Sequence, residues 1–331
     1  MDYFKERDIK NLKQLEKELK HLPPFCSRFF LGIGQTTTPL TRVGYALDLK
    51  NFFEFLKLEI DIFYQKENFE LADLELVEAF HIELYLNYLN KSCGQKMKQR
   101  RLCTLRSMFK YFFRQNLISK NILPNIDLPK INQKEIIRLE PNEVRGMVDV
   151  TEQADPQLNQ RQKSWFEHTK VRDNAIVTLL LGTGIRVSEC VGLNLNDIDF
   201  SANSLRVTRK GGNTTILYFG DEVAEKLKSH IGQREIKAEA LFLSLQNKRI
   251  DVRTVQIIVK KYAHLVTPLK KITPHKLRST YGTALYKETG DIYIVADVLG
   301  HKDVNTTKKH YAAISEDARK NVANLVKLKK D

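Results

Sequence analysis

Apolar residues in the first part of the chain recur every three to four positions, which is the spacing of helices with one buried face. Residues 4–20 follow this pattern and end before Pro23 and Pro24, which stop a helix. The same spacing predicts three more helices, over 41–58, 74–90 and 95–114. The N-terminal part of the chain is therefore expected to be helical.

The periodic pattern lapses between about residues 119 and 141, where prolines interrupt mixed polar residues. Domain boundaries usually fall in such stretches, and 331 residues exceed the common size of one domain. We therefore expect four parts along the chain: an N-terminal helix extension (1–24), a helical domain (25–130), a linker (131–141) and a second domain (142–331).

The second domain combines helices with one short β-rich stretch. Residues 197–219 are rich in β-branched and aromatic side chains and contain turn residues at 201–203 and 211–213, which predicts three antiparallel strands. Residues 152–164 have the composition of a polar loop. Helices are expected at 143–150, 172–181, 221–232, 251–262, 274–289 and 291–299. The predicted fold class is mostly α with a small antiparallel β-sheet, in two domains, of which the second is α+β.

Basic residues outnumber acidic ones, 54 Lys and Arg against 40 Asp and Glu, which gives a formal net charge of +14. Cations near phosphates add affinity by releasing counterions, so a polyanionic partner is favoured. Charge alone does not choose among DNA, RNA and an acidic membrane, and a solvated basic surface is a further explanation. The candidate DNA-contacting cations, most of them on the 95–114 helix, are Lys96, Lys98, Arg100, Arg101, Arg106 and Arg209.

Cysteine spacing and the lack of long apolar runs narrow the class of protein. The four cysteines lie far apart without a C-x-x-C pair, which argues against a zinc site and a disulfide framework. The first 20 residues are too charged for a secretory signal, and no stretch is apolar enough for a membrane span. A cytoplasmic protein with no membrane partner, no metal and no cofactor is expected.

Two segments that contain arginine have the features of a phosphate site. Arg186 lies in the turn of Gly182–Glu189, after an apolar helix, and its planar fork suits a phosphate. Thr273–Arg278 puts His275 and Arg278 on one face at a helix N-terminus, a favourable place for an anion. Taken singly, Arg186 is better explained as a solvated loop arginine, and a capped helix with an incidental histidine explains the second segment equally well.

Two further segments contain a lysine and a tyrosine. Lys210 lies within Thr208–Asn213, at the tip of a predicted hairpin. Tyr311 follows the Leu299–His301 turn. Each is ordinary by itself, because turn lysines are usually solvated and the chain has 12 tyrosines. The order and combination of the four segments decide their interpretation.

Taken together and in this order, the four segments resemble the tyrosine recombinase (phage integrase-like) family, from about Thr41 to the end of the chain. The resemblance implies Tyr311 as the nucleophile, Glu189 as a supporting residue, and a catalytic set of Arg186, Lys210, His275, Arg278, His301 and Tyr311. Ser279 replaces a histidine that many relatives have, the tyrosine spacing after His301 varies by a residue in the family, and His310 is a rival histidine. Residues 207–212 and 273–278 look closest to the single-chain Xer-type recombinases of Gram-positive bacteria.

The chemistry of phosphodiester cleavage fits these residues. Tyr311 supplies the nucleophile, and Arg186 and Arg278 would stabilise charge on the non-bridging oxygens. Lys210 is the candidate acid for the leaving 5′-oxygen, and His275 is the candidate acceptor of the tyrosine proton. Because a phosphotyrosine conserves the bond energy, religation requires no ATP, and the two arginines make a divalent metal unnecessary.

The resemblance also implies an assembly on DNA. Two domains would clamp duplex DNA, and a homotetramer would join two sites and exchange strands through a Holliday junction. Chromosome dimer resolution of the Xer type is the expected outcome, and integration or excision of a mobile element is the alternative. A type IB topoisomerase and a non-catalytic DNA-binding protein are the remaining rivals. The apolar stripe of residues 315–331 predicts a helix. The resemblance implies that this helix contacts a neighbouring protomer, and folding back on its own domain is the alternative. The target sequence and any accessory or directionality proteins stay open.

Overall fold

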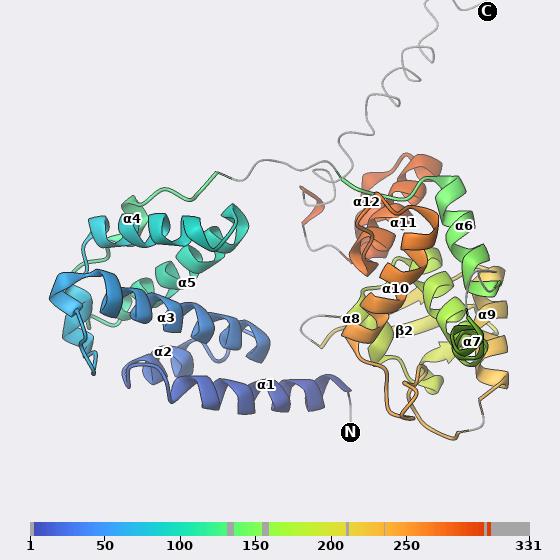
Figure 1. The fold of residues 1–331 in the computed structure, drawn as a ribbon, viewed down its shortest axis with the longest axis horizontal. Coiled ribbons are helices and arrows are strands. Elements are labelled where there is room, and N and C mark those ends of the chain that lie inside the picture. Colours follow the sequence, from blue (N-terminus) through green and yellow to red (C-terminus); the bar gives the residue numbers. More distant parts are fainter. Residues whose placement is uncertain are drawn as a thin grey trace, which may run out of the picture. The chain divides into compact units, whose positions relative to one another are not determined.

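The computed structural model describes residues 3–130, 136–153, 159–209, 212–234, 236–300 and 303–305. The chain divides into two compact units, Met1–Lys134 and Glu135–Asp331. The first unit is helical, and the second consists of helices and a small sheet (Figure 1). This arrangement confirms the predicted fold class.

Helices joined by short 3-10 turns build the first unit. Helix α3 begins at Pro39 because the Thr38 hydroxyl oxygen accepts a hydrogen bond from the backbone N–H of Thr41 at 3.3 Å, and proline suits the first helical position. Helix α1 packs along α3. The elements are α1 (Tyr3–Leu19), α2 (Cys26–Gly32), α3 (Pro39–Glu59), η1 (Asp61–Phe63), η2 (Leu71–Leu76), α4 (Ala79–Tyr88), η3 (Leu89–Lys91), α5 (Gln95–Arg114) and η4 (Leu123–Asn125).

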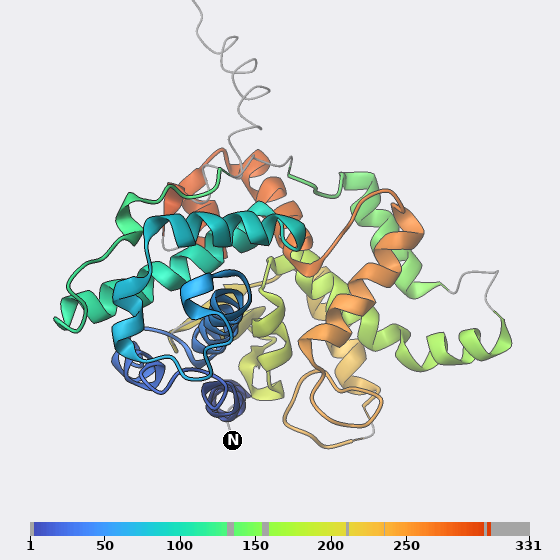
Figure 2. The same ribbon diagram turned by 60° about the vertical axis from the view of Figure 1, so that its left-hand side comes forward.

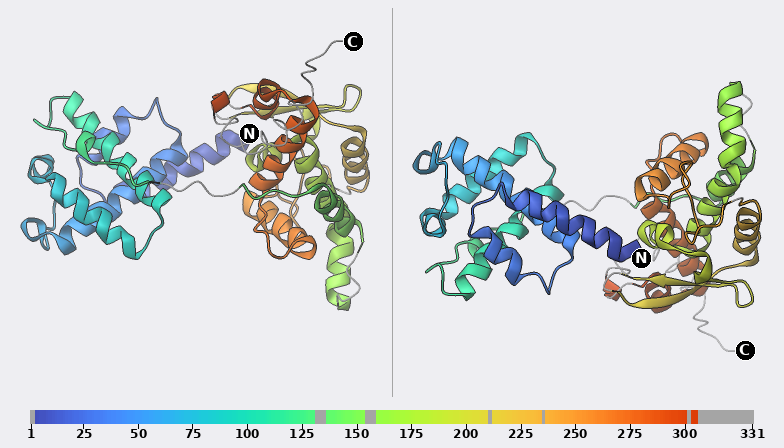
Figure 3. Two further views of the ribbon diagram at one scale, coloured as in Figure 1. Left: turned by 90° about the horizontal axis from the view of Figure 1, so that it is seen from above. Right: turned by 90° about the horizontal axis from the view of Figure 1, so that it is seen from below.

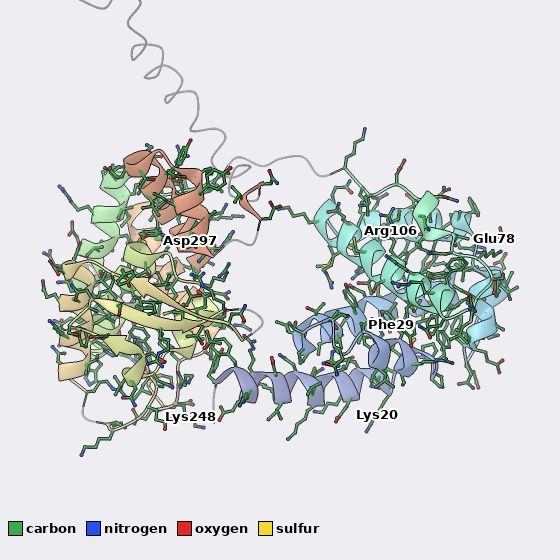
Figure 4. The ribbon with its side chains drawn as sticks, turned by 180° about the vertical axis from the view of Figure 1, so that it is seen from behind. Lys20, Phe29, Glu78, Arg106, Lys248 and Asp297 are labelled. Carbon is green, nitrogen blue, oxygen red and sulfur yellow. The ribbon has the colours of Figure 1, made fainter. Side chains whose placement is uncertain are left out.

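Aromatic side chains dominate the core of the first unit. Phe29, Phe52 and Phe109 are almost completely buried, and Figure 4 labels Phe29 among the helices of this unit. Burial of one such side chain stabilises a domain by about 1.5–3 kcal/mol. Leu15 of α1 and Leu22 belong to the same buried cluster, so the N-terminal helix shares the core of this unit.

Helix α7 runs through the second unit, where it packs against α6, α9 and α11. Its residues 175–180 are buried on all sides. Within the ranges given above, no helix has both the length and the apolar composition needed to span a membrane. The helical elements are α6 (Pro141–Glu152), α7 (Gln160–Thr183), α8 (Val187–Gly192), η5 (Leu195–Asp197), α9 (Asp221–Gly232), α10 (Val252–Val266), α11 (Pro274–Thr289) and α12 (Ile292–Leu299).

The sheet consists of β1 (Ile198–Asp199), β2 (Ser204–Thr208) and β3 (Thr214–Tyr218), antiparallel in the order β1-β2-β3. Leu205 pairs with Leu217, and both side chains are buried, whereas Arg206 pairs with the exposed Ile216. This alternation is the period-two pattern that predicted the strands. The sheet lies along one side of the unit (Figure 3), and the β2–β3 turn is the segment that contains Lys210.

Helices α7 and α4 are among those that differ from the sequence prediction. Helix α7 begins at Gln160, inside the stretch expected to be a loop, because Asn159 and Gln162 cap each other through bonds of 2.9 and 3.0 Å. Apolar periodicity does not reveal such a capping pair. The first half of α7 extends beyond the helices that pack on its second half (Figures 2 and 3). The helix expected over 74–90 is split into η2 and α4 by Glu78, whose backbone is extended.

Candidate active site

Arg186 lies where α7 gives way to α8. Gly184 ends α7 in the left-handed conformation, with φ of +60°, and the chain then turns so that Arg186 becomes the N-cap of α8. The guanidinium Nη1 donates to Glu189 Oε1 at 2.8 Å, and the Arg186 backbone N–H donates to Glu189 Oε2 at 3.0 Å. Since 36% of the Arg186 side chain is exposed and only 2% of Glu189 is, a buried carboxylate anchors a cation that still reaches solvent.

Arg278 lies in the N-terminal part of α11 and is 4% exposed. Its Nη1 donates to the Gly184 carbonyl oxygen at 2.6 Å, and its Nη2 donates to the carbonyl oxygen of Leu299. These bonds join the end of α7, the start of α11 and the end of α12. His275 is three residues earlier on α11 and is exposed, so an anion that approached this helix start would meet it.

The C-terminal end of α12 is the point on which the arginines converge. Gly300 ends this helix with φ of +60°, and Arg186 Nη2 donates to its carbonyl oxygen at 3.1 Å. Arg209, the last described residue before the hairpin tip, donates to Leu299 and Val298 at 2.7 and 3.1 Å. Three guanidinium groups therefore satisfy the carbonyl oxygens that a helix leaves without partners at its C-terminus.

Close packing around the two turns leaves no room for a side chain at either glycine. A Cβ at Gly184 would lie 2.5 Å from the Tyr281 ring, and a Cβ at Gly300 would lie 2.4 Å from Arg209 Nη1. Both residues also have φ of +60°, which L-residues with side chains rarely adopt. Glycine is thus required at each position by conformation and by space.

Glu189 is the negative charge within this cluster. Besides its contact with Arg186, Oε1 lies 3.9 Å from Arg209 Nη1. Burial lowers the pKa of the Arg209 guanidinium, and the Glu189 carboxylate opposes that shift. Burial also raises the pKa of the neighbouring Cys190 thiol to about 12. The Cys190 thiol therefore stays protonated and is a poor rival nucleophile.

The structure brings together part of the predicted catalytic set. Arg186, Glu189 and Arg278 meet around Gly184 and the end of α12. Lys210, His301 and Tyr311 lie outside the described residues. Lys210 nevertheless follows Arg209 directly in the chain, and His301 follows Gly300. The residue that precedes each of these two candidate catalytic groups therefore belongs to the arginine cluster. Among the described residues, no group of His, Cys, Asp and Glu side chains is placed to hold a metal ion.

The candidate DNA-contacting cations of α5 differ in how they are used within the protein. Lys96 is exposed. Arg100 forms two bonds with Asp48, of 2.7 and 2.6 Å, and its side chain remains 43% exposed. Arg101 donates to Asn51, and Arg106, labelled in Figure 4, donates to the Ile126 carbonyl oxygen. Contact of these residues with DNA stays a prediction.

Two of the candidate DNA-contacting cations are largely buried. Lys98 is 6% exposed and donates to Asn90, and Arg209 is 9% exposed and donates to the end of α12. Both cations are held by acceptors inside the protein in this structure, and contact of either one with DNA phosphates stays a prediction. Sequence reasoning missed Asp48, the buried carboxylate that holds Arg100. Its signal is an acidic residue among the apolar positions of the predicted 41–58 helix.

Comparison with known proteins places the chain in a family. The Phage integrase family matches residues 138–317. Tyrosine recombinase XerC of Leptospira interrogans is 30% identical over 298 residues, which cover 88% of this chain and 89% of that protein. Tyrosine recombinase XerC of Caldanaerobacter subterraneus is 31% identical over 305 residues, with coverage of 86% and 82%.

Solved structures have the same fold. The XerH site-specific recombinase bound to a palindromic difH substrate has a TM-score of 0.65 and 19% identity, and the match covers 83% of this chain and 77% of that one. A lambda integrase dimer bound to a core site has a TM-score of 0.64 and 17% identity, with coverage of 86% and 93%. At these identities the structures show the fold alone, and the family rests on the sequence matches. The resemblance carried by the four segments is confirmed: the chain belongs to the phage integrase family of tyrosine recombinases.

Proposed function

We propose that this protein is a site-specific recombinase that cuts and rejoins duplex DNA through a covalent bond between Tyr311 and a 3′-phosphate. The observation that carries the proposal is the convergence of Arg186 and Arg278 at the end of α12, where the buried Glu189 holds Arg186. The chain that leaves this point continues to His301 and Tyr311. Binding of DNA by the related XerH and lambda integrase supports DNA as the substrate.

The proposed cleavage step is an in-line displacement at phosphorus. The Tyr311 oxygen forms the new P–O bond as the bond to the 5′-oxygen breaks, His275 accepts the tyrosine proton, and Lys210 gives a proton to the 5′-oxygen. Arg186 and Arg278 stabilise the charge that develops on the non-bridging oxygens. Attack by the 5′-hydroxyl of another strand reverses the step and releases Tyr311, so no energy source is consumed.

We further propose that four protomers on two DNA sites exchange strands through a Holliday junction, with residues 315–331 contacting a neighbouring protomer. The XerC relatives favour chromosome dimer resolution as the outcome, because they match the chain over most of its length. Integration or excision of a mobile element is the second candidate. It is favoured by the spacing between Thr307 and Tyr311, which is longer than in the Xer-type pattern.

A two-site assay tests recombination against topoisomerase activity. The DNA is a duplex selected from a randomised pool by binding to the full chain, cloned twice in one supercoiled plasmid. A recombinase yields a deletion or inversion between the two copies, and a plasmid with one copy gives no such product. Relaxation of both plasmids at equal rates without any rearranged product would contradict the proposal and indicate a topoisomerase.

A further inference from the structure

Arg209 belongs to two parts of the catalytic unit at once. Its backbone closes the β2–β3 hairpin, because its N–H donates to the Asn213 carbonyl oxygen at 2.7 Å and its own carbonyl oxygen accepts from Gly212 N–H at 3.1 Å. Its side chain leaves the hairpin and reaches the end of α12. The next residue in the chain is Lys210, the proposed acid of the cleavage step.

The contact between Arg209 and α12 depends on the shape of a guanidinium. Two nitrogens of one planar group donate to the successive carbonyl oxygens of Leu299 and Val298, at 2.7 and 3.1 Å. The same group lies against the backbone of Gly300, where a Cβ would come within 2.4 Å of Nη1. A lysine has a single nitrogen and cannot reproduce this flat, two-point contact.

The position that Arg209 holds is the start of the segment leading to the other candidate catalytic groups. Gly300 is followed by His301, and its carbonyl oxygen is bonded by Arg186. Arg209 is 9% exposed, and Glu189, 3.9 Å from its Nη1, gives it a counter-charge. A buried cation with such contacts restrains its neighbours more than an exposed one, whose side chain moves freely.

We propose that Arg209 is a positioning residue that fixes the end of β2 to the Leu299–Gly300 turn, and that the proton delivery proposed for Lys210, the next residue in the chain, depends on this contact. The inference rests on the proposed function and extends it, because Arg209 would act through Lys210 without touching DNA. Misplacement of a catalytic group by about 1 Å can cost on the order of a hundredfold in rate. Loss of Arg209 should therefore affect proton delivery more than DNA binding.

The test compares Arg209→Gln with Arg206→Gln in the full chain. Arg206 is on the same strand and is exposed, so its variant loses the same charge without the α12 contact. The probe is the duplex selected from a randomised pool, nicked near its centre so that the cleaved product cannot religate. The phosphate that is cleaved carries either oxygen or sulfur as its bridging 5′ atom, and a sulfur leaving group does not need a proton.

On the oxygen substrate, Arg209→Gln should slow covalent adduct formation about tenfold to a hundredfold at saturating protein, with DNA affinity within about threefold of the wild type. On the sulfur substrate the rate should return to within about threefold of the wild type, as expected for Lys210→Ala. Adding Arg209→Gln to Lys210→Ala should change the oxygen rate by less than about threefold, because the acid is already missing. Arg206→Gln should cleave both substrates at the wild-type rate.

Three results would overturn the inference. Arg209→Gln cleaving the oxygen substrate at the wild-type rate means that the contact does not position the acid. Equal defects on both substrates, with Lys210→Ala rescued by sulfur, mean that Arg209 acts on another group. If the fold reductions in cleavage rate of the two single variants multiply in the double variant, Arg209 and Lys210 act independently. A wild type that forms no adduct on either substrate would contradict the proposed function itself. This outcome is distinct from the three results above, in which the wild type does form the adduct.

A melting curve of each variant controls for folding. If Arg209→Gln is unfolded at the assay temperature, Arg209→Lys replaces it, since lysine keeps the charge and one donor. This variant should show a smaller defect on the oxygen substrate and the same recovery with sulfur. An oxygen rate equal to that of the wild type in a folded Arg209→Lys would refute the need for the two-point contact.

Discussion

The change Glu189→Gln tests whether one buried carboxylate holds the arginine cluster together. The carboxylate accepts two bonds from Arg186, at 2.8 and 3.0 Å, and lies 3.9 Å from Arg209. Removing one partner of a buried ion pair costs about 3–5 kcal/mol. Glutamine keeps one oxygen as an acceptor, and Arg186 is 36% exposed to solvent, so we expect a smaller loss of about 2 kcal/mol in the free energy of unfolding.

Thermal unfolding of the full chain measures this loss. For a domain of this size, about 2 kcal/mol corresponds to a fall of roughly 4–8 °C in the melting temperature of the second unit. Glu225→Gln is the matched control, because its side chain is 73% exposed beside Lys226 and its loss should change stability by less than about 0.5 kcal/mol. Equal melting temperatures for the wild type and both variants would refute a role for Glu189 as the counter-charge of the cluster.

Three further outcomes follow from the described contacts. Lys96→Ala should weaken DNA binding and lower the slope of log K against log salt by about 1, whereas Lys98→Ala should leave the slope unchanged because its ammonium is bonded internally. Burial lowers the pKa of His230 from 6.5 to about 4. The free energy of unfolding should therefore fall by up to roughly 3 kcal/mol as the pH falls from about 6.5 to about 4, and denaturant titrations of His230→Gln should show a weaker pH dependence. Gly300→Ala should lower the melting temperature by the equivalent of about 1–3 kcal/mol through its φ of +60° and the clash with the guanidinium above it. Gly232→Ala, where a Cβ meets no atom, should be neutral in the same melting experiment.

The sequence predicted the features that depend on local patterns. Apolar spacing gave the α3 and α5 helices, and alternation with turn residues gave the three-stranded sheet. The four motif segments identified Arg186 and Arg278, and the structure brings both to the end of α12. Local signals suffice for these features because each segment carries its own periodicity, cap or turn.

Features that depend on contacts between distant segments could not be predicted. Arg209 reads as a hairpin cation in the sequence, and only the fold shows that its partners are the carbonyl oxygens of Val298 and Leu299. Lys98 reads as part of a basic helix face, yet Asn90 takes its ammonium inside the protein. Whether a long cationic side chain is free for DNA depends on which acceptors the fold brings near it, and one sequence does not contain that information.

The covalent bond at Tyr311 is the central claim, and peptide mapping of the trapped protein–DNA adduct tests it most directly. The wild type is incubated with the nicked selected duplex, denatured, and digested with protease and nuclease before mass spectrometry. We predict a nucleotide remnant on the peptide that contains Tyr311, with fragment ions locating it on that residue, and no adduct from Tyr311→Phe although this variant binds the duplex as tightly as the wild type. A remnant on Tyr281 or Tyr293, or an adduct that persists in Tyr311→Phe, would contradict the account.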